Sequence, residues 1–150
     1  MKHLFIVNPV AGGKDRREYV AEQARRALEG SEDAYELYVT TAPMDACAKI
    51  AAEAASGEEL RVYACGGDGT LNECVNGAVG RSNVAVTHFP CGTGNDFIKM
   101  FGEEKARFSD LADLVHGEVR PFDIIECCGR YALNICSVGI DARIGTVGHQ

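Results

Sequence analysis

The sequence has no long apolar segment. No run approaches the roughly 18 residues that a membrane-spanning helix needs. The apolar stretch within residues 1–8 is too short for a signal peptide and is followed by no small-residue cleavage site. The sequence therefore favours a cytoplasmic protein, with residues 3–8 as a buried strand.

Cysteine pairs are also missing. The seven cysteines are odd in number and form no C-x-x-C pair. This pattern argues against both a disulfide framework and a zinc site. Most of the cysteines lie inside apolar stretches, which favours small, buried hydrophobic side chains.

Positive charge is in short supply. Fifteen lysines and arginines stand against 22 acidic residues, so the formal net charge is −7. This balance argues against non-specific binding of nucleic acid. The early basic residues Lys14, Arg16, Arg17, Arg25 and Arg26 are best explained as a solvated helix face.

Two common nucleotide-binding signatures are absent. No G-x-x-x-x-G-K-[ST] segment occurs, which excludes a P-loop enzyme. The G-x-G-x-x-G pattern of dinucleotide-binding proteins is begun at residues 67–72 and 92–97, but both segments lack its last glycine. A nucleotide site in this chain must use other loops.

The chain does contain a regular alternation of strands and helices. Apolar runs predict strands at 3–8, 35–40, 60–65 and 84–89, and stripes at helical spacing predict helices at 15–29, 43–57, 70 onward, 96–101 and 109–116. Thr70 and Glu73 match a capping box, so Thr70 is the predicted N-cap. The alternation predicts an α/β fold, a parallel sheet with helices on both faces.

The pattern changes after Gly117. Residues 119–128 and 130–138 predict two strands joined at Gly129. We therefore expect an α/β nucleotide-binding domain at 1–117, followed at 118–150 by the beginning of a truncated, β-rich second domain.

Glycine-rich loops directly follow three of the predicted strands. They span residues 8–14, 66–73 and 90–96. In a parallel sheet the carboxyl ends of the strands lie at one edge, so the loops should converge there. Glycine allows the backbone to approach a ligand, and free N–H groups with a helix N-terminus attract anions. The arrangement predicts a polyphosphate site, in which Asp68 would meet hydrated Mg²⁺ or order the loop.

At these loops the sequence resembles the diacylglycerol kinase catalytic family, which includes bacterial lipid kinases. The matching motifs are N-P-x-A-G from residue 8, G-G-D-G-T-L-N-E from residue 66 and P-x-G-T-G-N-D from residue 90. Weaker agreement follows at Asp123, Ile124, Asn134 and residues 137–142. The resemblance implies an NAD-kinase-like or diacylglycerol-kinase-like nucleotide domain that binds ATP with Mg²⁺.

The loops and the resemblance together predict the nucleotide-binding residues. They are Asn8, Pro9, Val10, Ala11, Gly12, Lys14, Thr40, Gly66, Gly67, Asp68, Gly69, Thr70, Leu71, Asn72, Glu73, Gly92, Thr93, Gly94, Asn95 and Asp96. Asp68 is the one candidate for a catalytic role, and no metal ligands are assigned. In the family, acidic residues of a second β-sandwich domain are thought to activate the acceptor hydroxyl and hold magnesium, so we expect the main base there.

The implied function is transfer of the γ-phosphate of ATP to a lipid hydroxyl by a protein acting at the membrane surface. Family members are about twice as long as this chain, which is therefore expected to be an incomplete enzyme. Two alternatives stay open. One is a soluble small-molecule kinase related to NAD kinases, which share G-G-D-G-T, and the other is a non-catalytic nucleotide-binding module. Strand edges left open by a missing domain could also promote self-association.

Overall fold

A computed structural model describes residues 1–91 and 95–133 of the chain. Its four-stranded sheet has the order β2-β1-β3-β4, and every neighbouring pair is parallel. The strands are β1 (Lys2–Val7), β2 (Ala34–Val39), β3 (Leu60–Gly66) and β4 (Val84–Pro90). The α/β parallel sheet expected from the alternation is thus confirmed.

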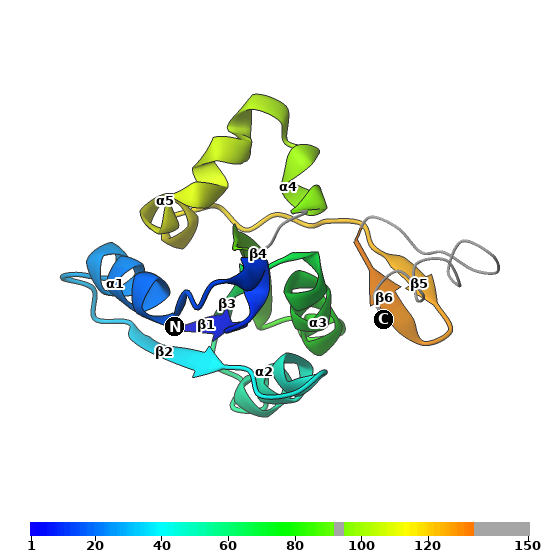
Figure 1. Ribbon diagram of the computed structural model, residues 1–150. Coiled ribbons are helices and arrows are strands. Elements are labelled where there is room, and N and C mark those ends of the chain that lie inside the picture. The colour runs from blue at the N-terminus through cyan, green and yellow to red at the C-terminus, as the bar shows by residue number, and fades with distance from the viewer. Residues whose placement is uncertain (92–94, 134–150) are drawn as a thin grey trace.

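Helices cover both faces of this sheet, as predicted (Figure 1). The helical segments are η1 (Ala11–Gly13), α1 (Arg17–Ala27), α2 (Asp45–Ala54), α3 (Asp68–Ala78), α4 (Asp96–Lys99), η2 (Gly102–Ser109) and α5 (Leu111–Val115). Helices α1 and α5 pack on one face, and α2 and α3 pack on the other. Each of these four helices buries apolar residues against the sheet and leaves its other side in solvent.

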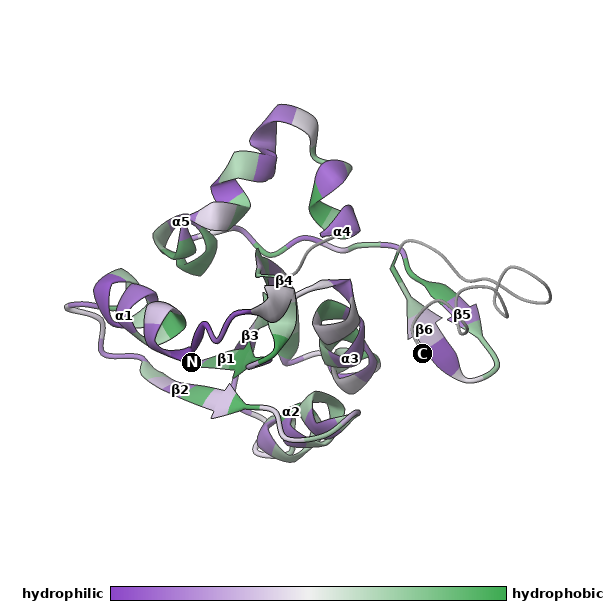
Figure 2. Cartoon of the chain, viewed as in Figure 1, coloured by the Kyte–Doolittle hydropathy of each residue, from purple (hydrophilic) through white to green (hydrophobic). Residues whose placement is uncertain are grey.

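The core is divided by the sheet into two apolar layers. Alternate residues of β1 point to opposite faces, so Phe5 joins the layer under α1 while Leu4 and Ile6 join the layer under α2 and α3. All three side chains are fully buried. Figure 2 shows β1 in the hydrophobic colour and much of α1 in the hydrophilic colour, which matches this division.

The register of the sheet brings the expected loops to one edge. Val7 pairs with Val39 on one side and Cys65 on the other, and Gly66 pairs with Pro90. The residues that leave these strands are therefore arranged along the carboxyl edge in the order Thr40, Asn8, Gly67 and Cys91. In parallel α/β sheets this edge is where ligands bind.

The predicted start of the third helix was wrong. Helix α3 begins at Asp68 with Gly67 as its N-cap, so Thr70 lies inside the first turn. The capping-box interpretation failed because the Thr70 side chain is buried against the backbone of Gly66, where it cannot cap a helix end.

The segment after α4 also differs from the expectation. A 3-10 helix, η2, fills residues that the sequence pattern left unassigned. The strand predicted at 119–128 begins later than expected, at Ile125, and no strand lies between α5 and that residue. Pro121 has no N–H to donate to a strand ladder there.

A separate two-stranded antiparallel sheet follows, with strands β5 (Ile125–Cys127) and β6 (Arg130–Ala132). Gly129 lies in its turn with φ 77°, as the predicted hairpin requires. The expected continuation of the second strand to residue 138 lies outside the described residues. The domain boundary near 117 remains a prediction.

Candidate phosphate-binding site

The amino end of α3 forms the centre of the candidate site. Gly67 leaves β3 in an extended conformation and becomes the N-cap, with its carbonyl accepting from Leu71 N at 3.1 Å. The first N–H groups of a helix have no partner within the helix, and they carry a partial positive charge. Within the described residues, a Cβ built on Gly69 would meet no atom within 4 Å outside its own helix backbone and chain neighbours. The helix end is therefore open to a ligand.

Gly66 has a separate reason to be glycine. A Cβ at Gly66 would lie 2.7 Å from Cβ of Thr70, which is closer than real Cβ atoms come to such neighbours. The Thr70 hydroxyl in turn accepts a 3.4 Å hydrogen bond from Nδ2 of Asn8. The close Gly66–Thr70 packing thus joins the second loop to the first.

The first loop is a short 3-10 turn after β1. Asn8 N donates to Cys65 O at 3.1 Å, and Asn8 Oδ1 accepts from Val10 N at 3.1 Å. Gly12 and Gly13 have φ of 64° and 71°, a region in which glycine carries little strain. Lys14 is exposed just beyond them. The loop is held at its base and presents its tip to solvent.

Thr40 lies at the same edge of the sheet, beside the first loop. Its N–H donates to Val7 O at 2.9 Å, and its hydroxyl donates to the same carbonyl at 3.4 Å. These contacts fix the backbone where β2 ends, immediately next to Asn8 in the order of strands.

The third loop is attached to the second through backbone and side-chain contacts. Cys91 N donates to Gly66 O at 2.9 Å, while Gly92, Thr93 and Gly94 lie outside the described residues. Asp68 accepts hydrogen bonds from the N–H groups of Asp96 and Phe97, at 2.8 and 3.3 Å. Asp68 therefore orders the start of α4 in this conformation.

Not every predicted residue lies at the open helix end. Leu71 is buried in the apolar layer shared with α2, so its side chain contributes to packing. Asn72 is exposed, and its carbonyl accepts from the side chain of Asn76 at 2.8 Å. Asp96 is exposed and pairs with Lys99 at 2.7 Å, and Asn95 has φ 48°.

One residue at this site was missed by the sequence analysis. His88, in β4, is fully buried and shares a 2.8 Å hydrogen bond with the Gly66 carbonyl through Nε2. Burial lowers the pKa of His88 and raises the pKa of Cys91 nearby, so both groups stay neutral at ordinary pH. The available signal was a histidine inside an otherwise apolar strand.

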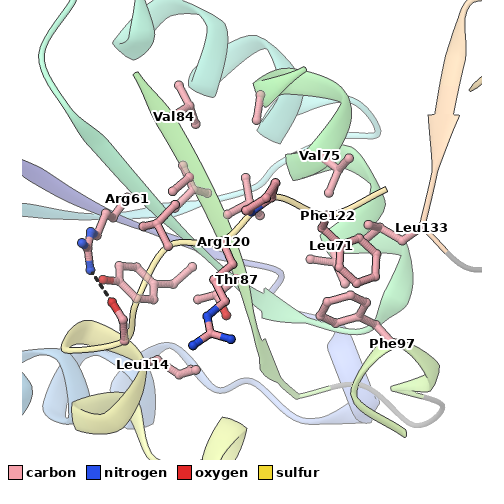
Figure 3. Close-up of a pocket in the computed structure, with 18 of the residues that line it drawn as sticks. Arg61, Leu71, Val75, Val84, Thr87, Phe97, Leu114, Arg120, Phe122 and Leu133 are labelled. Carbon is pink, nitrogen blue, oxygen red and sulfur yellow. Dashed lines mark hydrogen bonds between the residues drawn. The ribbon is translucent and has the colours of Figure 1, made fainter. Parts of the chain in front are cut away.

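A cavity of about 1130 Å³ lies elsewhere, along β4 (Figure 3). Its lining includes Val84, Thr87, Phe97, Leu114 and Phe122. Among the described residues of the predicted site, Leu71 alone lines this cavity. The cavity is thus distinct from the open end of α3.

The described residues contain neither a candidate metal cluster nor a candidate membrane span. In residues 1–91 and 95–133 there is no group of three or more His, Cys, Asp or Glu side chains placed to hold a metal ion. Over the same ranges, none of the helices has the length and hydropathy to cross a membrane.

The fold and the site define a class of protein, a parallel α/β domain with glycine-rich loops gathered at the carboxyl edge of its sheet. Comparison with known families identifies the family within this class. The family model described as "Diacylglycerol kinase catalytic domain" matches residues 2–127. The chain belongs to the diacylglycerol kinase catalytic domain family.

Individual relatives agree with the family match. The "Diacylglycerol kinase" of Bacillus subtilis (strain 168) is 35% identical over 141 residues, which are 90% of this chain and 45% of that protein. "Probable lipid kinase YegS-like" of Pseudomonas aeruginosa (strain PAO1) is 32% identical over 142 residues, 94% of this chain and 45% of that protein. This chain therefore spans about half the length of the curated relatives it matches.

A solved structure shows the same fold. A crystal structure of a diacylglycerol kinase from Bacillus anthracis (strain Sterne) superposes with a TM-score of 0.68 at 28% identity. The match covers 97% of this chain and 52% of that one.

Proposed function

We propose that this chain is the ATP-binding part of a lipid kinase, which transfers the γ-phosphate of ATP to a lipid hydroxyl. The observation that carries the proposal is Gly69, in the first turn of α3 at the carboxyl edge of the sheet. Family membership supports the kinase assignment.

Gly69 has no explanation within the described protein. Its φ lies outside the left-handed region, and a Cβ there would meet nothing within 4 Å. Glycine in a helix is less favourable than alanine by about 0.8–1 kcal/mol. A residue that lowers stability, relieves no strain and avoids no contact in the protein is explained if a phosphate approaches the backbone at that point.

The neighbouring loops would complete the nucleotide site. We assign the first loop, from Asn8 to Gly12, to the polyphosphate together with Lys14, whose positive charge favours an anion. Thr40 is placed at the same edge and would contact the nucleotide beside this loop. Gly92, Thr93 and Gly94 are assigned by the family motif alone, as members of the third loop.

The chemistry proposed for this part is positioning and charge stabilisation. Phosphoryl transfer requires little covalent work from the protein, so fixed N–H groups at a helix end can contribute directly to holding the transferring group. Mg²⁺ would supply charge neutralisation at the phosphates. It commonly takes one or two carboxylates and keeps several waters, and Asp68 is the carboxylate that we assign to it. The main base is expected in a second domain.

The proposed acceptor is diacylglycerol or a related lipid, presented at a membrane surface to a protein that is otherwise cytoplasmic. The outer edges of β2 and β4 carry no further strand within the described residues, so a second copy could pair there. Light scattering across a concentration series would test for such an oligomer.

The first experiment compares MgATP binding by the wild-type chain and by the Gly69→Ala variant, using calorimetry. We expect the variant to bind MgATP at least about tenfold more weakly, because one lost phosphate hydrogen bond with added crowding is worth roughly 1.4 kcal/mol or more. We expect its unfolding midpoint without ligand to stay the same or rise, since alanine favours the helix.

Ala52→Val is the matched control. Ala52 is exposed in the last turn of α2, and the added bulk there should leave the affinity for MgATP unchanged. Equal MgATP affinity in wild type and Gly69→Ala would contradict the site assignment. Binding of NAD in place of ATP would favour the small-molecule kinase, an alternative to which none of the comparisons points.

A further inference from the structure

His88 is a buried histidine to which the proposed function assigns no role. Its ring lies in β4, whose residue 88 pairs with Ala64 of β3, and it reaches along the neighbouring strand to the carbonyl of Gly66 at 2.8 Å. A carbonyl oxygen can only accept, so Nε2 carries the proton and donates. The other ring nitrogen, Nδ1, must then be an acceptor.

That acceptor is buried without a partner. His88 is 0% exposed, and Nδ1 makes no hydrogen bond within the part of the chain that the structure describes. A buried acceptor left without a donor destabilises the fold. Gly66 O already accepts from Cys91 N at 2.9 Å, so the carbonyl would not be left unpaired if His88 were replaced. For stability alone, an apolar residue of similar volume would serve at position 88 at least as well.

The position of the contact indicates what the histidine is for. Gly66 is followed by Gly67, the N-cap of α3, and the two residues share one planar peptide group. Holding the Gly66 carbonyl therefore holds the Gly67 N–H, which lies at the open helix end. The ring also lies 6.5 Å from that of Phe97, the residue whose N–H binds Asp68. His88 thus contacts the second loop at Gly66 and helix α4 at Phe97.

We propose that His88 is a positioning residue for the phosphate-binding loop: its Nε2–H fixes the Gly66–Gly67 peptide so that the Gly67 N–H points toward the bound phosphate. The inference rests on the proposed function, since it assumes that ATP binds at the end of α3. It differs from a structural role because it predicts opposite effects on stability and on binding.

The test uses two replacements of His88 in the full chain. His88→Leu keeps a similar volume and removes the donor, whereas His88→Gln places an amide N–H at the same reach as Nε2. We expect His88→Leu to bind MgATP about three- to tenfold more weakly, the range for losing one ordering hydrogen bond. Its unfolding midpoint without ligand should equal or exceed that of wild type. His88→Gln should restore affinity to within about twofold of wild type.

Two further measurements keep the result interpretable. Thr87→Val, at the adjacent position on the opposite face of β4, should leave MgATP affinity unchanged. Amide hydrogen exchange of Cys91, whose N–H donates to the Gly66 carbonyl, should speed up in His88→Leu and not in His88→Gln. This reports on the Gly66–Gly67 peptide even if the leucine variant is less stable than expected.

The outcomes separate the two proposals. If wild type binds no MgATP, the proposed function fails and the inference fails with it. If wild type binds MgATP and His88→Leu binds it equally well, or if the glutamine variant is as weak as the leucine variant, only the role of His88 is overturned.

Discussion

The backbone N–H of Asp96 donates a 2.8 Å hydrogen bond to Oδ2 of Asp68, a residue 28 positions earlier in the chain. Phe97 N donates to the other carboxylate oxygen at 3.3 Å. Asp68 thus acts on the start of α4 as a capping residue would, although it belongs to a different helix. The Asp68 side chain thus adds to the backbone hydrogen bond from Cys91 to Gly66 in joining the second and third glycine-rich loops.

Replacing Asp68 should therefore affect the fold before it affects any chemistry. Asp68→Ala leaves the two N–H groups without their acceptor, and we expect it to lower the free energy of unfolding by about 1 kcal/mol, as for loss of a helix cap. Urea unfolding measures this change, and hydrogen exchange at Phe97 should locate it. The control is Glu103→Gln, which replaces an exposed acidic residue in η2 and should change stability little.

Asp68→Asn distinguishes ordering from catalysis. Its amide oxygen can still accept from Asp96, so most of the stability should remain. In an active enzyme that contains this chain, loss of phosphate transfer with MgATP affinity retained would assign Asp68 to the reaction. Loss of MgATP affinity with stability retained is what the magnesium assignment predicts. Parallel losses of stability and affinity would instead leave it the ordering role alone.

Gly66→Ala should be costly because of Thr70. The new Cβ would lie 2.7 Å from Cβ of Thr70 and 3.1 Å from its Cγ2. We expect a loss of about 1–3 kcal/mol in the free energy of unfolding, the range for overpacking a core contact. The double variant with Thr70→Ala removes part of the crowding, so a double-mutant cycle should show coupling between the sites. Additive effects would argue against the close packing.

The sequence predicted the sheet well because its strands are short apolar runs separated by glycine-rich turns, and each of these signals is local. It also placed the loops at one edge, because parallel strands share their direction. The start of α3 was mispredicted for a reason that is not local. Threonine is a residue type that often caps helices, but the Thr70 side chain packs on Gly66 and hydrogen-bonds with Asn8, which lies 62 positions earlier.

Two other contacts that hold the loops in place could not be predicted from the sequence, because they are also long-range. The bond from Asp68 to α4 and the bond from His88 to Gly66 each join residues more than 20 positions apart. Nothing in the spacing of the motifs indicates either. The sequence could identify which loops gather at the site, but not which side chains hold those loops in place.

Asn76 attaches the two-stranded sheet to α3. Its Nδ2 donates to Tyr131 O at 2.9 Å, and its Oδ1 accepts from Tyr131 N at 3.0 Å, so the amide pairs with β6 as another strand would. We expect Asn76→Ala to speed amide exchange at Tyr131 strongly, with a loss of about 1–2 kcal/mol in local stability for two bonds.

Asn76→Asp provides the comparison for this prediction. A carboxylate can still accept from Tyr131 N but cannot donate to Tyr131 O, so protection at Tyr131 should be intermediate. Unchanged exchange in both variants would mean that the hairpin is held to α3 by its apolar contacts instead.

The pH dependence of stability should report on a ring of ion pairs that joins β1, β2 and α2. Lys2 contacts Glu36 and Glu53 at 2.9 and 2.8 Å, and Lys49 contacts the same two carboxylates at 3.0 and 2.7 Å. Hydrogen bonds from the lysines hold the pKa of both glutamates below the usual 4.5, and the same bonds raise the pKa of both lysines above 10.5.

Whether stability rises or falls with pH depends on how each pKa differs between the folded and the unfolded chain. A glutamate whose pKa is lowered by folding stabilises the protein fully above about 4.5, and that stability is lost as the pH falls through the folded value. The lysine contribution is present below 10.5 and is lost as the pH rises through its raised pKa. Each pair is partly exposed, so about 0.3–1 kcal/mol per pair is the expected scale.

Urea unfolding across the acidic range tests this prediction with Glu36→Gln and Glu53→Gln combined. The double variant should be less stable than wild type at neutral pH and should lose less stability on acidification below about 4.5. The buried histidines His3 and His88, whose pKa values are lowered by burial, remain in both proteins. The stability that these histidines contribute starts to be lost as the pH falls below 6.5 and is lost as the pH falls through their lowered pKa values. This contribution should be the same in wild type and variant. Identical profiles below 4.5 would mean that the ring contributes nothing measurable to the stability of the folded chain.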